Sequence, residues 1–220
     1  MSIKAVVPVR NNSMRCKNKN FRDFAGSSIF KIKIEQLKRI SKIDGILVIS
    51  DNKEALEHAQ NNGCEIFEEA PTPPENIAPN KLFELIATVT DSEDIMIAHA
   101  TSPLLLDHSI ERAIDFYYEN LDVYDSVNSA LPIKKFLFLD NKPLNYDPAK
   151  HPRSQDLKPI MARIPAISIM SKRLMLERCA NTGYHPYLFP ITDIEAVDLD
   201  TEDEFEYAEY LYKKYYISGK

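Results

Sequence analysis

The chain has 220 residues, of which 44% are hydrophobic, so it can bury the core of one globular domain. Its net charge of −6 argues against a general nucleic-acid or membrane surface, because such surfaces carry a basic footprint. Cys16, Cys64 and Cys179 lack the spacing of a metal or redox motif, and no apolar run suits a signal peptide or a membrane span. We therefore expect a soluble, cytoplasmic protein with reduced thiols.

Strand and helix signals alternate along the first half of the chain. Short apolar runs predict buried strands, and amphipathic segments between them predict helices. The predicted strands are residues 3–9, 45–50, 64–69 and 94–100, and the predicted helices are 27–42, 52–63, 81–89 and 107–119. The proline-rich stretch 70–80 is expected to be neither helix nor central strand. Because this alternation is typical of parallel sheets covered on both faces, we predict an α/β fold with a mainly parallel sheet.

The second half of the chain is less regular. Strand-like segments are expected at residues 125–131, 164–170 and 187–191, and helices at 171–179 and 201–216. Residues 132–162 lose periodicity and have the pattern of a hairpin and loop. We therefore expect one domain over residues 1–220, with an inserted lobe at about 132–162.

The connection after the first predicted strand, RNNSMRCKNKN (residues 10–20), concentrates positive charge against the acidic trend of the chain. Backbone N–H groups and amides can surround phosphate oxygens while Arg and Lys neutralise their charge. The connection has no glycine, so it is not a Walker loop or a dinucleotide fingerprint. Because ligands bind at the carboxyl ends of parallel strands, it predicts an anion site. The alternative is a solvated loop whose charges only keep the protein soluble.

Two aspartates near the C-terminus form a second candidate site. On an extended strand Asp198 and Asp200 would face the same side, while Leu199 points into the core. Such a pair suits Mg²⁺, which prefers one or two carboxylates together with phosphate and water oxygens. The alternative is an acidic helix entry, in which Thr201 caps the next helix and the acids only favour its positive end.

Six segments, in the same order, resemble the signature of the sugar-activating cytidylyltransferases, the CMP-sialic acid and CMP-Kdo synthetases. The resemblance covers nearly the whole chain, although no single motif is decisive. The segments are Arg10-x-x-Ser13-x-x-x-x-x-Lys19-Asn20, Gly45 to Asp51, Ala100-Thr-Ser-Pro-Leu104, Asp125-Ser-Val-x-Ser129, Pro152-Arg153-x-Gln155 and Asp198-Leu-Asp-Thr-Glu-x-Glu-Phe205. The resemblance implies a Rossmann-like nucleotidyltransferase fold and a homodimer in which the inserted lobe reaches into the partner subunit.

The resemblance also implies a reaction: the hydroxyl of a sugar acid attacks the α-phosphate of CTP and releases pyrophosphate, with Mg²⁺ as cofactor. The implied acceptors are nonulosonic acids such as sialic, pseudaminic or legionaminic acid. By position, Arg10 and Lys19 would hold the triphosphate, and Arg153 would meet the acid or the phosphates. Asp198 and Asp200 would carry the metal ion. The predicted nucleotide-binding set also includes Asn12, Ser13, Arg15, Asn20, His99 and Ser102. Asn12 and His99 stand where the family usually has glycine and glutamine, and His99 either contacts the ligand or is an edge-of-sheet histidine.

The chain departs from the family pattern at several motif positions. Met14 stands where a lysine is usual, Leu105 where an arginine is usual, and Pro165 within a segment that is usually N-G-A. Lys134 and Lys135 either face an anionic acceptor or are solvated. Three alternatives therefore stay open: a cytidylyltransferase for a non-sugar acceptor, a non-catalytic nucleotide-binding relative, and a glycosyltransferase that holds a nucleotide-sugar diphosphate at the two aspartates.

Overall fold

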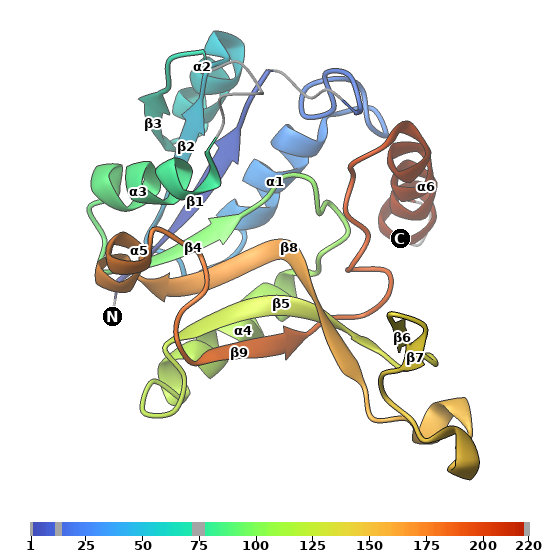
Figure 1. The fold of residues 1–220 in the computed structure, drawn as a ribbon. Coiled ribbons are helices and arrows are strands. Elements are labelled where there is room, and N and C mark those ends of the chain that lie inside the picture. The colour runs from blue at the N-terminus through green and yellow to red at the C-terminus, as the bar shows by residue number, and fades with distance from the viewer. Residues whose placement is uncertain (1, 12–14, 72–77, 218–220) are drawn as a thin grey trace.

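A computed structural model describes residues 2–11, 15–71 and 78–217. Its centre is a seven-stranded sheet with the strand order β3-β2-β1-β4-β8-β5-β9 (Figure 1). Within this sheet β8 is antiparallel to both neighbours, β4 and β5, and the other pairings are parallel, so the prediction of a mainly parallel sheet is confirmed. The strands are β1 (Ile3–Val9), β2 (Gly45–Ser50), β3 (Glu65–Glu68), β4 (Asp94–Ala98), β5 (Ser126–Ile133), β8 (Ile160–Ser171) and β9 (Pro186–Pro190).

Helices cover both faces of the sheet. One apolar core contains residues of α1, α2, α4 and α6, and a second core contains residues of α3 and α5. Figure 1 shows α3 and α5 in front of the sheet and α1 and α4 behind it. In the parts of the chain that the structure describes, every helix is too short or too polar to cross a membrane. The helices are α1 (Ile29–Lys38), α2 (Lys53–Asn61), α3 (Pro79–Val89), α4 (Asp107–Glu119), α5 (Lys172–Arg178) and α6 (Glu202–Tyr212), which continues as a π-turn (Lys213–Ile217).

The boundaries of the elements follow local capping chemistry. Helix α1 begins after Ser28, whose hydroxyl accepts a hydrogen bond from the backbone of Lys31, so it starts two residues later than expected. Helix α3 starts at Pro79, within the stretch predicted to be non-helical. That prediction was wrong for its last two residues because proline suits the first position of a helix, where its missing N–H costs nothing. Gly63 follows α2 with a φ of +78°, as expected for a left-handed cap.

The irregular segment between β5 and β8 is shorter than predicted. Strand pairing continues to Ile133 on β5 and begins at Ile160 on β8, so residues 134–159 form what we call the lobe. The lobe projects beyond the end of the sheet (Figure 1). It contains the short hairpin strands β6 (Phe138–Leu139) and β7 (Lys142–Pro143) and two 3₁₀ turns (Pro148–Lys150 and Ser154–Asp156).

Candidate active site

The carboxyl ends of β1 and β4 meet the aspartate segment at one edge of the sheet. The backbone N–H of Leu199 donates to the carbonyl of Thr101, in the turn after β4, over 3.0 Å. Leu199 is fully buried in the main core, as the sequence predicted. The backbone of Lys17, in the loop after β1, donates to the carboxylate of Glu202 at the start of α6. Two segments predicted to bind the same ligand are therefore side by side.

Lys19 and Arg15 both contact Asp200. The Lys19 Nζ lies 3.1 Å from Asp200 Oδ1 and also donates to the carbonyl of Leu199. Arg15 Nη2 lies 2.9 Å from Asp200 Oδ2. Burial raises the pKa of Asp200, but the hydrogen bond and charge of Lys19 and then the charge of Arg15 outweigh it, so the pKa is below its usual value. Asp200 is therefore an ionised carboxylate held by two cations.

Asp198 lies in a different environment from Asp200. Its Oδ1 atom is buried and has no hydrogen-bond partner among the described residues. Burial raises the pKa of Asp198, the charge of Asp200 adds to the rise, and a hydrogen bond from Thr101 opposes it. A buried carboxylate oxygen without a donor is a group that a cation would stabilise.

The two aspartates fit the needs of Mg²⁺ better than those of a metal held only by protein. In the described chain no cluster of three His, Cys, Asp or Glu side chains could hold a metal ion. Magnesium uses one or two carboxylates and completes its octahedral shell with water and substrate phosphates. Asp198, with its unpaired oxygen, and Asp200 are the side chains that would hold the ion. Thr201 also caps α6 in a capping box with Glu204, so the helix-entry reading of this segment holds as well.

Arg10 and Asn20 have partners within the chain. Arg10 Nε and Nη2 form a two-pronged ion pair with Glu69, at 3.0 and 2.6 Å, directly after β3. The structure therefore places the Arg10 guanidinium on the β3 side of the site and does not bring it to Asp200. Asn20 is buried, and its Nδ2 donates to the carbonyl of Arg10 over 3.1 Å, which closes the loop on itself. Asn12, Ser13 and Met14 lie outside the described residues.

The turn after β4 places His99 and Ser102 among positive charges. Burial, followed by the charges of Arg163, Lys33 and Lys19, lowers the pKa of His99 to about 4, so the imidazole is neutral at neutral pH. Ser102 is fully buried, and its hydroxyl has no partner among the described residues. Both residues predicted on this turn therefore lie at the same edge of the sheet as the basic connection after β1, which we call the basic loop.

Sequence reasoning missed Lys33, which lies beneath this turn. It is fully buried in α1, and its Nζ donates to Gln36 Oε1 over 2.6 Å and to the Ser102 carbonyl over 3.1 Å. The signal was present, because position 33 is four residues from both Ile29 and Leu37 on the apolar face of the helix. A lysine there is a buried amine whose hydrogen bonds support the turn.

The burial of Lys33 predicts a measurable pH dependence of stability. Burial lowers the pKa of Lys33 from 10.5 to about 7, so between these values the unfolded chain binds a proton that the native protein lacks. The free energy of unfolding should therefore rise with pH across this window, by up to about 1.4 kcal/mol per pH unit from this group. We expect Lys33→Met to lose this rise in urea denaturation compared at pH values of about 7.5 and 9.5. Parallel pH profiles of the two proteins would contradict the burial of a titrating lysine.

The structure does not bring Arg153 to the sheet edge within one chain. Arg153 is exposed on the lobe, where its Nε lies 2.7 Å from Asp156 Oδ2. Lys134 Nζ is 3.4 Å from the Gln155 carbonyl, and Lys135 is exposed. In Figure 1 the lobe lies at the far side of β5 and β8 from α1 and α2. In the described chain Arg153 and Lys134 therefore contact residues of the lobe itself.

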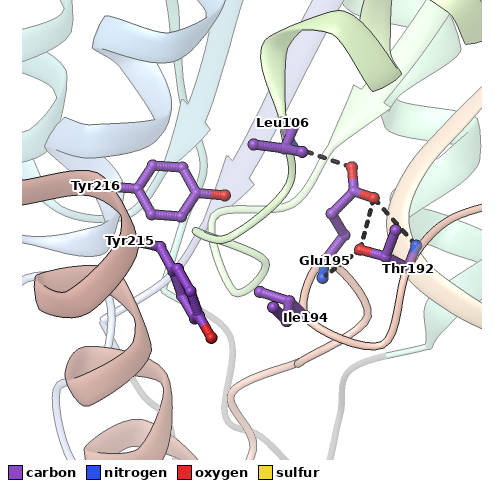
Figure 2. A pocket seen from close by; sticks show the side chains of 6 residues that line it. All are labelled: Leu106, Thr192, Ile194, Glu195, Tyr215 and Tyr216. Carbon is purple, nitrogen blue, oxygen red and sulfur yellow. Dashed lines mark hydrogen bonds between the residues drawn. The ribbon is translucent and has the colours of Figure 1, made fainter. Parts of the chain in front are cut away.

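A separate cavity of about 380 Å³ lies between α6 and the start of α4, lined by Leu106, Thr192, Ile194, Glu195, Tyr215 and Tyr216 (Figure 2). Its carboxylate, Glu195, is buried and accepts hydrogen bonds from Thr192 Oγ1 (2.8 Å) and from the backbone of Leu106 (3.3 Å). Burial raises the pKa of Glu195, but these hydrogen bonds and one from Ser109 outweigh it and lower the pKa. Glu195 therefore anchors the start of α4, and the rest of the lining is mainly apolar.

Comparison with known proteins identifies the family of the chain. The cytidylyltransferase family model matches residues 4–220. A pseudaminic acid cytidylyltransferase from Campylobacter jejuni is 25% identical over 94% of this chain and 95% of its own length. An N-acylneuraminate cytidylyltransferase from Streptococcus agalactiae is 25% identical over 91% of this chain and 51% of its own length.

Solved structures show the same fold. The CMP:2-keto-3-deoxy-manno-octonic acid synthetase complexed with CTP superposes with a TM-score of 0.71 at 12% identity, over 98% of this chain and 100% of that one. The 4-diphosphocytidyl-2C-methyl-D-erythritol synthase from Anaerococcus prevotii gives a TM-score of 0.66 at 12% identity, over 96% of each chain. The chain belongs to the cytidylyltransferase family and is a nucleotidyltransferase.

Proposed function

We propose that this enzyme transfers CMP from CTP to a sugar acid of the nonulosonic class and releases pyrophosphate. The contact of Lys19 and Arg15 with Asp200, beside Asp198, carries the proposal. These groups combine cations for a triphosphate with carboxylates for a divalent ion at the edge where parallel sheets bind ligands. The family match and the full-length similarity to a pseudaminic acid cytidylyltransferase support the choice of nucleotide and acceptor class.

The chemistry requires positioning and charge neutralisation more than covalent help from the protein. The oxygen of the acceptor hydroxyl attacks the α-phosphorus of CTP in line with the bond to pyrophosphate and gives up its proton to solvent. That P–O bond breaks, and pyrophosphate leaves with the bonding electron pair. Lys19 and Arg15 would exchange part of their contact with Asp200 for phosphate oxygens. Mg²⁺, when bound by Asp198 and Asp200, would neutralise phosphate charge. Ser102 and His99 would line the floor of the site.

The direct test is pyrophosphate release from CTP and Mg²⁺ with a panel of acids: sialic, pseudaminic, legionaminic and Kdo, with neutral sugars as controls. We expect release with at least one acid and a CMP-linked product of matching mass. If CTP and Mg²⁺ stabilise the protein against heat but no acid gives pyrophosphate, a non-catalytic relative is the better reading. When phosphorylated and non-sugar acceptors are added to the panel, release with one of these alone would support a cytidylyltransferase for a non-sugar acceptor. Turnover of a nucleotide sugar would support the glycosyltransferase.

We also propose that the enzyme works as a homodimer in which the lobe of one subunit completes the site of the other. The lobe exposes Phe138, Leu139 and Leu144, which are large apolar side chains that a second copy would cover. Arg153 lies on the same projection and is exposed, so a contact that buries the apolar residues would also bring a cation to a neighbouring chain.

Mixing two inactive variants tests this arrangement. Lys19→Ala and Arg153→Ala should each be inactive alone, but a co-refolded mixture should recover about a quarter of wild-type turnover, because half the dimers are mixed and each has one intact site. Light scattering should show dimers for both variants. If the mixture stays inactive, or if Arg153→Ala alone keeps full activity, Arg153 does not act across subunits.

A further inference from the structure

Arg163 lies where β8 enters the sheet from the lobe, at the edge that carries the active site. It pairs in register with Ala130 of β5, and three residues later the carbonyl of Ala166 accepts a hydrogen bond from the backbone of His99 over 3.0 Å. Strands β4 and β5 run in the same direction on either side of β8, so the end of β8 near Arg163 shares their carboxyl edge.

A bulge sets the position of Arg163. Ser168 pairs with Asn128, and Arg163 with Ala130, so β8 uses five residues where β5 uses two. The hydroxyl of Ser129 holds this irregularity, since it donates to the carbonyl of Ile164 (2.7 Å) and accepts from the backbone of Ile167 (3.0 Å). Bulges re-aim side chains beside active sites.

The Arg163 guanidinium has more N–H groups than its neighbours can accept. Its Nη2 donates to Ser168 Oγ over 3.2 Å, and that same oxygen already receives Asn128 Nδ2 (2.9 Å) and Asn181 Nδ2 (3.4 Å). Within residues 2–11, 15–71 and 78–217, no carboxylate forms an ion pair with Arg163. Arg163 is exposed to solvent. Desolvation of its guanidinium by neighbouring parts of the chain lowers its pKa, and no acidic side chain offsets this. A guanidinium carries five N–H groups, so several remain available to an anion.

The side chains that act electrostatically on His99 also indicate an anion site at the end of β4. The side chains whose charges act on His99 are Arg163, Lys33 and Lys19, three basic groups from different elements. In the sheet order, β1 and β8 flank β4 (Figure 1). The basic loop after β1 and Arg163 on β8 therefore approach the end of β4 from opposite sides. In the proposed function Lys19 and Arg15 face the triphosphate of CTP. Arg163, on the other side of β4, would therefore face a different anionic group.

We infer that Arg163 binds the carboxylate of the acid acceptor and so selects carboxylate-bearing sugars over neutral ones. The inference rests on the proposed function and deepens it. An arginine suits this role because its planar fork matches a carboxylate with two parallel hydrogen bonds. Once bound, the acceptor carboxylate would neutralise the positive region around neutral His99 and keep the acceptor hydroxyl on the side facing the nucleotide.

The test pairs an enzyme variant with a substrate variant. The active acid from the panel and its carboxamide, which lacks the charge, are compared as acceptors for the wild type and for Arg163→Gln. We expect the wild type to favour the acid by about 10- to 100-fold in kcat/KM, and Arg163→Gln to lose most of that preference, with the loss in acceptor KM and little change in the KM for CTP. Arg163→Lys should keep part of the preference. Arg173→Gln, an exposed arginine on α5, is the matched control and should behave as the wild type.

Two results would overturn the inference without touching the proposed function. If the wild type turns over the acid but Arg163→Gln lowers acid and carboxamide rates by the same factor, Arg163 has a structural role only. If Arg163→Gln raises the KM for CTP instead, it contacts the nucleotide. A wild type that is inactive with every acid would overturn both proposals, and it is recognised before any variant is made. Calorimetric binding of the acid to Arg163→Gln in the presence of CMP provides a readout that does not depend on turnover.

Discussion

Replacing Lys19 with alanine is expected to reduce kcat/KM for CTP by about 10²- to 10³-fold, the usual cost of losing one donor aimed at developing charge. Lys19 is mostly buried, with 13% of its side chain exposed, and its Nζ contacts both Asp200 and the Leu199 carbonyl. Alanine removes the ammonium that links the basic loop to the aspartate segment. Pyrophosphate release at saturating acceptor concentration measures the effect.

Lys17→Ala is the matched control for this change. Lys17 belongs to the same loop and carries the same charge, but its side chain is exposed and only its backbone contacts Glu202. We expect a change within a few-fold, because solvent and salt screen the charge of an exposed cation. If Lys17→Ala and Lys19→Ala have equal effects, the loop acts through net charge alone and the specific role of Lys19 is wrong.

Replacing either aspartate with asparagine is expected to abolish both turnover and the response to Mg²⁺. A bound divalent ion contributes several kcal/mol to a phosphoryl-transfer transition state, so we expect a loss of at least about 10²-fold. The two variants should differ in stability without metal. Asp198→Asn should be at least as stable as the wild type, because a buried carboxylate with a raised pKa is replaced by a neutral group. Asp200→Asn should be slightly less stable, because Lys19 and Arg15 lose their partner.

Direct metal binding separates this proposal from the helix-entry alternative. Mn²⁺, followed by electron paramagnetic resonance with CTP present, should bind the wild type and bind weakly to both variants. Asp203→Asn is the control, since Asp203 is an exposed acid in the first turn of α6. If all three acids act only on the helix dipole, each substitution should lower stability by a few tenths of a kcal/mol and leave Mn²⁺ binding intact.

Local patterns in the sequence were enough to predict most of the strands and helices of the fold. Apolar runs with turn residues on either side place the strands, and β1 and β2 match their predicted bounds because a buried parallel strand is apolar throughout. Thr201 with Glu204 marks the start of α6, since capping involves only neighbours in the chain. Differences at element boundaries include the start of α1, which follows the Ser28 cap two residues later than expected, and the start of α3, where Pro79 occupies the first helical position.

The candidate site required the tertiary structure. The sequence by itself identified a basic loop and a late pair of aspartates, because both are short and chemically distinct. Their contact joins Lys19 and Asp200 across 181 residues, which no local pattern encodes. The partner of Arg10, the burial of Lys33 and the position of Arg163 at the carboxyl edge of β4 and β5 likewise depend on sheet order and on the antiparallel insertion of β8. Strand order is decided by the packing of the whole core, so side chains from distant strands meet only once that core has formed.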